Sequence, residues 1–321
     1  MKTYIIRRII IAVPLLLVMS FVTFLFIHLA PGNYFDSLRL NPQISEETIL
    51  KYQAAFHLDK PVIVQYLYWL KGIFRLDLGY SFFYNCPVSK VIFSRAFNTI
   101  ILALASLALT WLLAIPLGIY AALKHNRIID RLFSVLSLFG LSMPGFFLGL
   151  IGLYLANVSG LLPLGGMRST NFDSLSGINK AFDILRHLIL PASVIAISGI
   201  GSLQRIMRAN VLEVLRQQYI LCARAKGLPE NKVIYKHALR NAINPLITIF
   251  GYQLSDLLSG AALIEIVCNW PGLGMVMLTA VRAQDLFLVM AGMLISGVLL
   301  LFGNLTSDIL LAWSDPRIRY A

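Results

Sequence analysis

The chain has 321 residues, of which 58% are hydrophobic and only 13% charged, and its mean hydropathy is +0.76. Soluble domains carry about 25% charged residues, so this composition indicates an integral membrane protein and excludes a single soluble globular domain. The net charge of +12 would suit nucleic-acid binding only on a basic soluble surface, which the sequence does not provide.

The apolar runs predict an all-α protein with six membrane-spanning helices, because each run is close to the roughly 20 residues that cross a bilayer. The expected spans are residues 9–30, 97–123, 132–158, 188–203, 243–264 and 286–313. The first follows Lys2, Arg7 and Arg8, as a signal peptide would, but it exceeds the roughly 7–15 residues of a signal core and lacks a clear cleavage site. We therefore expect it to be retained. Pro144 and Gly145 mark a candidate kink in the third span.

The segment between the first two spans, residues 31–96, is mixed and polar. Ser45 can cap a helix whose first turn holds Glu46 and Glu47. A second helix there has an apolar face at helical spacing, made of Val62, Tyr66, Trp69, Leu70 and Phe74. We predict a small external subdomain on the membrane interface, where Tyr and Trp are favoured. The expected organisation is an N-terminal helix over 1–30, the subdomain over 31–96 and a five-helix core over 97–321.

The distribution of basic residues predicts the orientation. With six spans both termini lie on one side, and that side holds most of the Lys and Arg residues, chiefly in residues 205–242. The long segments 161–186 and 265–285 are expected as loops on the other side. Since basic residues are retained in the cytoplasm, we predict that both termini and residues 205–242 are cytoplasmic.

Residues 219–245 form the only long polar segment late in the chain, and most of them fall within the expected cytoplasmic loop 205–242. We expect two short helices in it. The first ends at Lys226, Gly227 tolerates the positive φ that follows a helix, and Pro229 suits the first turn of the second. The second helix carries basic residues four positions apart, which share one face: Lys232, Lys236 and Arg240. A rigid helix–Gly–helix elbow would be a contact for a partner, but these cations could equally serve only to hold the loop in the cytoplasm.

No catalytic constellation is present. The sequence contains no GxxxxGK[ST] phosphate loop, no HExxH, no GxSxG and no GxGxxG, so we expect neither an enzyme nor ATP hydrolysis by this chain. The five histidines are scattered, and the three cysteines lack metal-ligand spacing. We favour small buried thiols and leave open a bridge between Cys86 and Cys268.

Two carboxylates lie inside expected spans. Asp256 is near the middle of the fifth, with Gln253 and Gly260 on the same face, and Asp308 is in the sixth. Charge in a span is costly and usually faces a cavity or a polar partner, so Gln253 and Asp256 are candidates for lining a translocation path. An interhelical hydrogen bond is the alternative, and it is favoured for Asp308.

The elbow sequence, ARAKGL followed by KHALRNA and a proline, resembles the cytoplasmic EAA loop of ABC-importer permeases of the dipeptide/oligopeptide/nickel branch. The acidic residue that opens the general motif is replaced by Leu221. Further segments resemble the same family: RRII…HLAPG, LDKP…QY, EIV…WPGLG and DPRIRY. The chain most resembles the first, or B-type, of the two permease subunits.

This resemblance implies a type I ABC-importer architecture in a prokaryotic inner membrane, with the elbow docking on an ATPase. The implied coupling residues are Ala223, Arg224, Ala225, Lys226, Gly227, Leu228, His237, Arg240 and Asn241. It also implies a second permease subunit in a heterodimer, two cytoplasmic ATPases that bind ATP, and an extracytoplasmic binding protein. The chain itself would hold no cofactor. The cargo would be di- or oligopeptides or a related solute such as a nickel chelate.

The residues leave two other function classes as alternatives. An ion-coupled secondary transporter would use Asp256 and Asp308, but the internal repeat typical of that class is not evident. An intramembrane enzyme is disfavoured, because no nucleophile–base pair is visible. Dependence of uptake on ATP rather than on an ion gradient distinguishes the importer from the secondary transporter.

Overall fold

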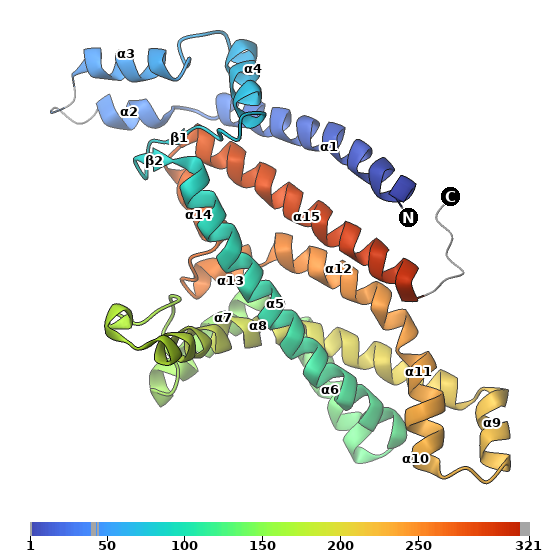
Figure 1. Ribbon diagram of the computed structural model, residues 1–321. Helices are drawn as coiled ribbons and strands as arrows, with labels where there is room; N and C mark the ends of the chain where they lie inside the picture. Colours follow the sequence, from blue (N-terminus) through green and yellow to red (C-terminus); the bar gives the residue numbers. More distant parts are fainter. Residues whose placement is uncertain (1, 40–42, 44, 315–321) are drawn as a thin grey trace. The chain divides into compact units, whose positions relative to one another are not determined.

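The structure is a computed structural model that describes residues 2–39, 43 and 45–314, and the described part is almost entirely helical (Figure 1). Its helices pack into two compact units. Unit 1 comprises residues 1–99 and 271–301, and unit 2 comprises residues 100–270 and 302–321. Two long helices, α5 (Val88–Leu123) and α15 (Leu286–Ser314), contribute to both units.

Unit 1 contains the first four helices, a two-stranded antiparallel ladder and one late helix, besides its parts of α5 and α15. These are α1 (Lys2–Leu29), α2 (Tyr34–Arg39), α3 (Glu46–Ala55), α4 (Val62–Ile73), β1 (Tyr80–Ser81), β2 (Cys86–Pro87) and α14 (Leu273–Arg282). The ladder pairs Tyr80 with Pro87 and Ser81 with Cys86. Side chains of α4, α5, α14 and α15 form one core around Trp69, Ile92 and Leu288.

Local capping in unit 1 follows the sequence closely. Ser45 accepts a hydrogen bond from the backbone N–H of Thr48, which confirms the predicted cap of α3. The predicted apolar face of α4 is confirmed only in its middle. Tyr66 and Trp69 are buried, whereas Val62 and Phe74, at the two ends of the face, are exposed.

The prediction that residues 265–285 form a loop is wrong in its secondary structure. Most of it is helical, because α13 (Ala262–Val267) extends into it and α14 occupies Leu273–Arg282. The apolar residues of α14 recur at helical spacing, and Leu273, Val276 and Ala280 are buried in the core of unit 1. Asp285 then begins α15: its carboxylate accepts hydrogen bonds from Ser81 Oγ at 2.6 Å and from the backbone N–H of Leu288 at 3.3 Å.

Unit 2 contains the remaining helices. They are α6 (Ile128–Ser142), α7 (Gly145–Ser159), a 3-10 turn (Phe172–Ser174), α8 (Gly177–Leu215), α9 (Gln218–Ala225), α10 (Glu230–Lys232), a π-helical segment (Val233–Ala238), α11 (Leu239–Ala242), α12 (Asn244–Gly260) and α13. The most extensive helix pair is α6 with α8. Glycines allow its close approach, because a Cβ at Gly201 would lie 2.5 Å from the carbonyl oxygen of Ser137.

The longest helix, α8, begins earlier than expected. We predicted a loop through residue 186, but the helix starts at Gly177 and has 39 residues. The polar composition of its first turns concealed three apolar residues at helical spacing, Ile178, Phe182 and Leu185. At 1.5 Å per residue α8 is roughly 58 Å long, nearly twice the ~30 Å hydrocarbon core of a bilayer.

Four described helical segments are long and apolar enough to cross a membrane, and α6 with α7 would form a fifth if the bent pair is one span. The two helices meet at an angle of 104°. Pro144, which cannot donate a backbone hydrogen bond, lies at this break, so the predicted kink is confirmed. The expected fifth span is occupied by α12, which has 17 residues, and α13. The structure is therefore that of an all-α membrane protein with several spans, and the count of six stays a prediction.

Candidate functional site

The predicted elbow is formed by residues 218–242 of unit 2. Its first helix, α9, ends with a complete Schellman motif: the N–H of Leu228 bonds the carbonyl of Ala223 at 3.4 Å, and the N–H of Gly227 bonds that of Arg224 at 2.9 Å. Gly227 has φ +75°, a conformation that costs glycine little. Pro229 then precedes α10. The expected first helix, glycine turn and second helix are all confirmed.

The elbow has a small hydrophobic core of its own. Ile220 and Ala223 of α9 pack against Val233 and Ala238 of the π-helical segment, and Leu228 covers them from the turn. Ile220, Val233 and Ala238 are fully buried. Because both limbs contribute to one core, the elbow is a folded unit and not a mobile charged loop.

An ion pair joins the two limbs across the glycine turn. Arg224 Nη2 lies 2.6 Å from Glu230 Oε1, and Arg224 Nε donates to Glu230 Oε2 at 3.2 Å. The hydrogen bond from Arg224 lowers the pKa of Glu230 and raises that of Arg224. The resemblance implies Arg224 as a coupling residue, and in the structure its charge is paired within the elbow.

Glu230→Gln is expected to speed hydrogen exchange of the Gly227 and Leu228 amides by at most about fivefold, since exposed ion pairs contribute ~0.2–1 kcal/mol. Because the pKa of Glu230 is lowered from 4.5, the pair is complete at pH 7 and is lost as the pH falls below 4.5 through the lowered value. Hydrogen–deuterium exchange checks both statements. Glu213→Gln, on the exposed face of α8, is the matched control, and equal exchange in the two variants would show that the pair does not hold the turn.

The second limb presents basic residues outward. Lys232, Lys236 and Arg240 are all exposed. We predicted that they share one face of an α-helix, but the segment from Val233 to Ala238 is π-helical, so the α-helical spacing behind that prediction is not kept. Lys226 is also exposed. An open groove of about 520 Å³ runs along this limb, lined by Tyr219, Lys236, His237, Arg240, Asn241 and Asn244.

The two limbs are also joined at their base, and the elbow is anchored on α8. Asn241 donates to the hydroxyl of Tyr219 at 2.7 Å, and Asn210 of α8 donates to the carbonyl of Ala242 at 3.2 Å. Ile234, Leu239 and Ala242 belong to a core shared with α5, α8 and α12. The elbow is therefore joined to α8 by a hydrogen bond and by packed side chains.

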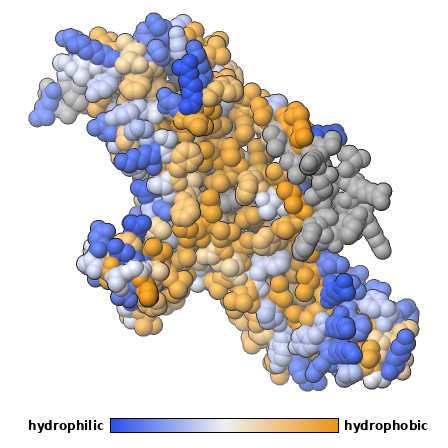
Figure 2. Space-filling view, viewed as in Figure 1, coloured by the Kyte–Doolittle hydropathy of each residue, from blue (hydrophilic) through white to orange (hydrophobic). Residues whose placement is uncertain are grey.

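The elbow lies at the C-terminal end of α8, whereas the loop 160–176 lies at the other end of this helix within unit 2 (Figure 1). Figure 2 shows hydrophilic residues gathered over α9 and α10, in contrast to the hydrophobic surface of the long helices. The elbow is thus a polar projection at one end of an apolar helical unit.

The candidate path residues lie on α12. The carbonyl of the Gln253 side chain accepts a hydrogen bond from Trp111 Nε1 of α5 at 2.8 Å, and the Trp111 ring meets Phe250 edge-on at 5.2 Å. Asp256 is exposed and Asp308 is half-buried. The structure thus ties Gln253 to α5. Trp111 was not predicted, because a tryptophan in an apolar run carries no signal of its hydrogen-bond partner.

A second polar contact was also missed, at the start of α6. Asp130 is buried, and Arg208 of α8 bonds both its carboxylate oxygens, at 2.5 and 2.8 Å. His125 Nδ1 lies 3.4 Å from the same carboxylate. The sequence did offer one signal for this contact, because Asp130 is the single acidic residue in the basic segment 124–131. This cluster fixes α6 against the half of α8 that leads to the elbow.

Among the described residues, no group of three or more His, Cys, Asp or Glu side chains could hold a metal ion. All three cysteines are free thiols in the structure, and the expectation of buried thiols is right only for Cys268, because Cys86 is half-buried and Cys222 is exposed.

Comparison with known proteins agrees with the sequence and the geometry. Residues 114–320 match the family described as binding-protein-dependent transport system inner membrane component, and residues 1–105 match the corresponding N-terminal family. The chain is 39% identical to the oligopeptide transport system permease protein AppB of Bacillus subtilis (strain 168), with 100% of both chains covered. It is 34% identical to the dipeptide transport system permease protein DppB of Alkalihalophilus pseudofirmus, again with 100% of both covered.

A putative peptide permease protein of Brucella suis biovar 1 is 36% identical, with 99% of both chains covered. The matched family is a transport component and not an enzyme family, and it is a component of the inner membrane. The predicted resemblance, the multi-pass membrane location and the expectation of a permease are confirmed. The chain belongs to the family of binding-protein-dependent transport system inner membrane components, the permease subunits of ABC importers.

Proposed function

We propose that this chain forms part of the translocation pathway of an ATP-driven importer for di- or oligopeptides or a related small solute such as a nickel chelate. The relatives named for oligopeptide, dipeptide and peptide transport support peptides as the cargo class. The chain would be the first of two permease subunits in a heterodimer. Two cytoplasmic ATPases would bind the ATP, and an extracytoplasmic binding protein would deliver the cargo.

The observation that carries this proposal is the folded elbow. It has its own core, a glycine turn and an ion pair between its limbs, and it shares a second core with α8 and α12. A loop that served only to retain positive charge in the cytoplasm would need none of these contacts. The elbow is suited to receive movement from an ATPase and to pass it to the helices as a rigid body.

Within this proposal the coupling surface is the outer face of the elbow. Lys226, Leu228, His237 and Arg240 would contact the ATPase, while Arg224 acts through Glu230 to hold the turn. Ala223 belongs to the elbow core, Ala225 ends α9, and Asn241 holds the base through Tyr219. The residues of the family motif thus divide into those that shape the elbow and those that meet the partner.

We further propose six spans with both termini in the cytoplasm, residues 31–96 as an external subdomain and residues 97–321 as the permease core. The placement of the elbow and the loop 160–176 at opposite ends of the ~58 Å α8 supports this orientation. A cysteine-labelling reporter at Asn171 is expected to react from outside intact cells, and one at Lys232 only after permeabilisation. Reaction of both from the same side would overturn the six-span topology.

Asp256→Asn tests the proposed path. If Asp256 lines it, uptake should change severalfold while assembly of the complex and its thermal stability stay the same, because the exposed carboxylate is not part of a core. Uptake and melting temperature are measured together, with Asp308→Asn beside it. Loss of stability in parallel with uptake would assign Asp256 to helix packing instead.

Uptake into membrane vesicles that contain the assembled complex tests the proposed function itself. Uptake of a labelled peptide should require ATP on the cytoplasmic side and should persist when ion gradients are collapsed. Uptake that follows the proton or sodium gradient and ignores ATP would favour the ion-coupled transporter with Asp256 and Asp308 as carriers.

A further inference from the structure

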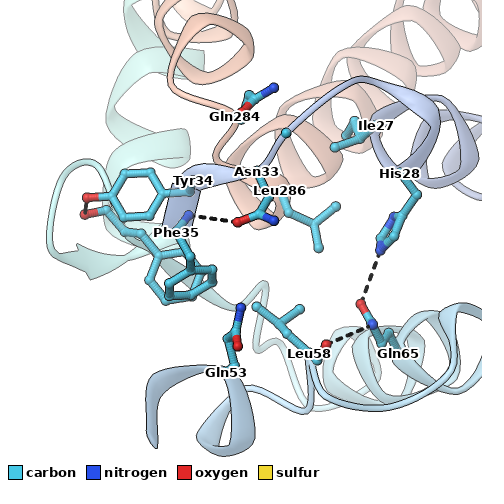
Figure 3. Close-up of a pocket in the computed structure, with 12 residues that line it drawn as sticks. Ile27, His28, Asn33, Tyr34, Phe35, Gln53, Leu58, Gln65, Gln284 and Leu286 are labelled. Atoms are coloured by element: carbon cyan, nitrogen blue, oxygen red, sulfur yellow. Dashed lines mark hydrogen bonds between the residues drawn. The ribbon is translucent and has the colours of Figure 1, made fainter. Parts of the chain in front are cut away.

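Unit 1 contains a pocket of about 220 Å³ (Figure 3). Its lining comes from α1 to α4, from the loops around them, and from the residues that begin α15. The lining residues are uncharged carboxamide, aromatic and aliphatic side chains with one histidine: Ile27, His28, Gly32, Asn33, Tyr34, Phe35, Gln53, Leu58, Gln65, Phe82, Gln284 and Leu286. No Lys, Arg, Asp or Glu is among them.

One side of the pocket is held by a chain of hydrogen bonds. Gln65 Nε2 donates to the carbonyls of Leu58 at 3.1 Å and Lys60 at 2.7 Å, which directs Gln65 Oε1 toward His28 Nε2 at 3.2 Å. His28 Nδ1 lies 3.0 Å from the carbonyl of Phe24. These side chains, visible in Figure 3, are committed to the fold and form a fixed wall.

Three other carboxamides keep hydrogen-bonding capacity for a ligand. Asn33 Oδ1 accepts from the N–H groups of Phe35 and Asp36, so its Nδ2 donors are left. Gln284 Nε2 donates to the carbonyl of Pro31 at 2.6 Å, so its Oε1 acceptor is left. The Gln53 side chain makes no hydrogen bond with any described residue. It borders the pocket on the side opposite Gln284 (Figure 3).

The remaining groups are donors and acceptors without charge, which is the complement of a peptide group with its one N–H and one C=O. A carboxylate would lose hydration here with no cationic Lys or Arg among the lining residues and with the Asp36 carboxylate beside Gly32 and Gln284, which is costly. Ile27, Leu58, Phe82 and Leu286 provide an apolar surface beside these groups. The volume suits one residue and its two flanking peptide groups.

We propose that this pocket binds an uncharged, chain-internal peptide residue, with an apolar side chain and a peptide group on each side, in preference to a free zwitterionic dipeptide. The chemistry follows from the pocket alone. The molecule that supplies this peptide residue is inferred from the proposed function, because both an oligopeptide cargo and a loop of the extracytoplasmic binding protein contain such a residue.

N-acetyl-leucine amide is the probe, titrated against the full chain in detergent by ligand-observed saturation-transfer NMR. We expect saturable binding with a Kd on the order of millimolar, given the small size of the probe. N-acetyl-leucine, which ends in a carboxylate, should bind at least about tenfold more weakly. Equal binding of the two compounds would overturn the proposal, and so would the absence of saturable binding.

Gln53→Met keeps the shape of the side chain and removes its donor and acceptor, so affinity for the probe should fall roughly five- to tenfold. Asn179→Met, at an exposed carboxamide of α8 in unit 2, is the matched control and should bind as the parent does. If Gln53→Met lowers the melting temperature, Gln53→Asn is used in its place. This variant shortens the carboxamide side chain, and its affinity for the probe is compared with that of the parent. Unchanged affinity in a folded Gln53 variant would overturn the assignment.

Displacement of the probe shows whether a peptide or a loop of the binding protein supplies the bound residue. A leucine tripeptide blocked at both ends should displace it if the ligand is a peptide, and the purified binding protein should displace it if the ligand is a loop. Either result supports a peptide residue as the ligand, and displacement by neither would contradict it. None of these measurements needs transport, so their failure is distinguishable from failure of the proposed function.

Discussion

Gly227→Val is expected to reduce ATP-dependent uptake at least tenfold and to lower the amount of ATPase that co-purifies, while the membrane spans still insert. Gly227 has φ +75°, and a Cβ at this position would meet no atom within 4 Å, so the chain's own packing does not oppose a side chain. The cost arises from the backbone, because a left-handed conformation costs an L-residue about 1–2 kcal/mol and a β-branched one more. Valine should therefore open the Schellman turn and displace the second limb.

Two companion variants separate backbone strain from bulk. Gly227→Asn adds a side chain that tolerates positive φ, so it should retain most of the uptake. Gly177→Val places valine at the start of α8, where a Cβ also meets nothing within 4 Å and φ is not positive, and it should behave as the parent does. Normal uptake and ATPase retention in Gly227→Val would leave the elbow as a charged topology anchor only.

Asp130→Asn should lower the stability of the chain by about 1–3 kcal/mol, because it leaves Arg208, whose side chain is 25% exposed, without its counter-charge. Asp130 is 3% exposed and accepts two hydrogen bonds from Arg208 and one from the backbone N–H of Asn126. Thermal unfolding of the purified chain in detergent measures the loss. Because Arg208 precedes the elbow on α8, uptake should fall as well.

Glu47→Gln is the matched control for Asp130→Asn. It removes the ion pair with Lys51 on α3, whose two side chains are 77% and 74% exposed, and the expected loss is below ~0.5 kcal/mol. The double variant Asp130→Asn with Arg208→Gln should recover part of the stability, since no unpaired charge is left. If Asp130→Asn unfolds as the parent does, the contact does not fix α6 on α8.

Patterns confined to neighbouring residues predicted most of the local structure. Ser45 before two glutamates, Gly227 after an apolar-faced helix and Pro144 inside an apolar run each act through their own backbone, and the structure has the cap, the turn and the break. The same local signals placed the first residue of α8 wrongly. There Ile178 and Phe182 lie among polar residues, and their helical spacing was outweighed by composition.

The contacts that hold the candidate site join residues far apart in the chain, and no local pattern reports them. Asp130 and Arg208 belong to different helices, as do Trp111 and Gln253. Arg224 and Glu230 belong to the two limbs of the elbow, and only the glycine turn brings them together. Periodicity showed which faces are apolar, whereas these pairings depend on how the helices pack.

Site-specific photo-crosslinking tests whether the elbow contacts a cytoplasmic ATPase. A photoreactive residue at Lys226, which is exposed beside the glycine turn, should crosslink the assembled complex to the ATPase, and the yield should depend on ATP. The same residue at Asn171, in the loop at the other end of α8, should not. Crosslinking of the ATPase from Asn171 but not from Lys226 would show that the elbow is not the contact for the ATPase.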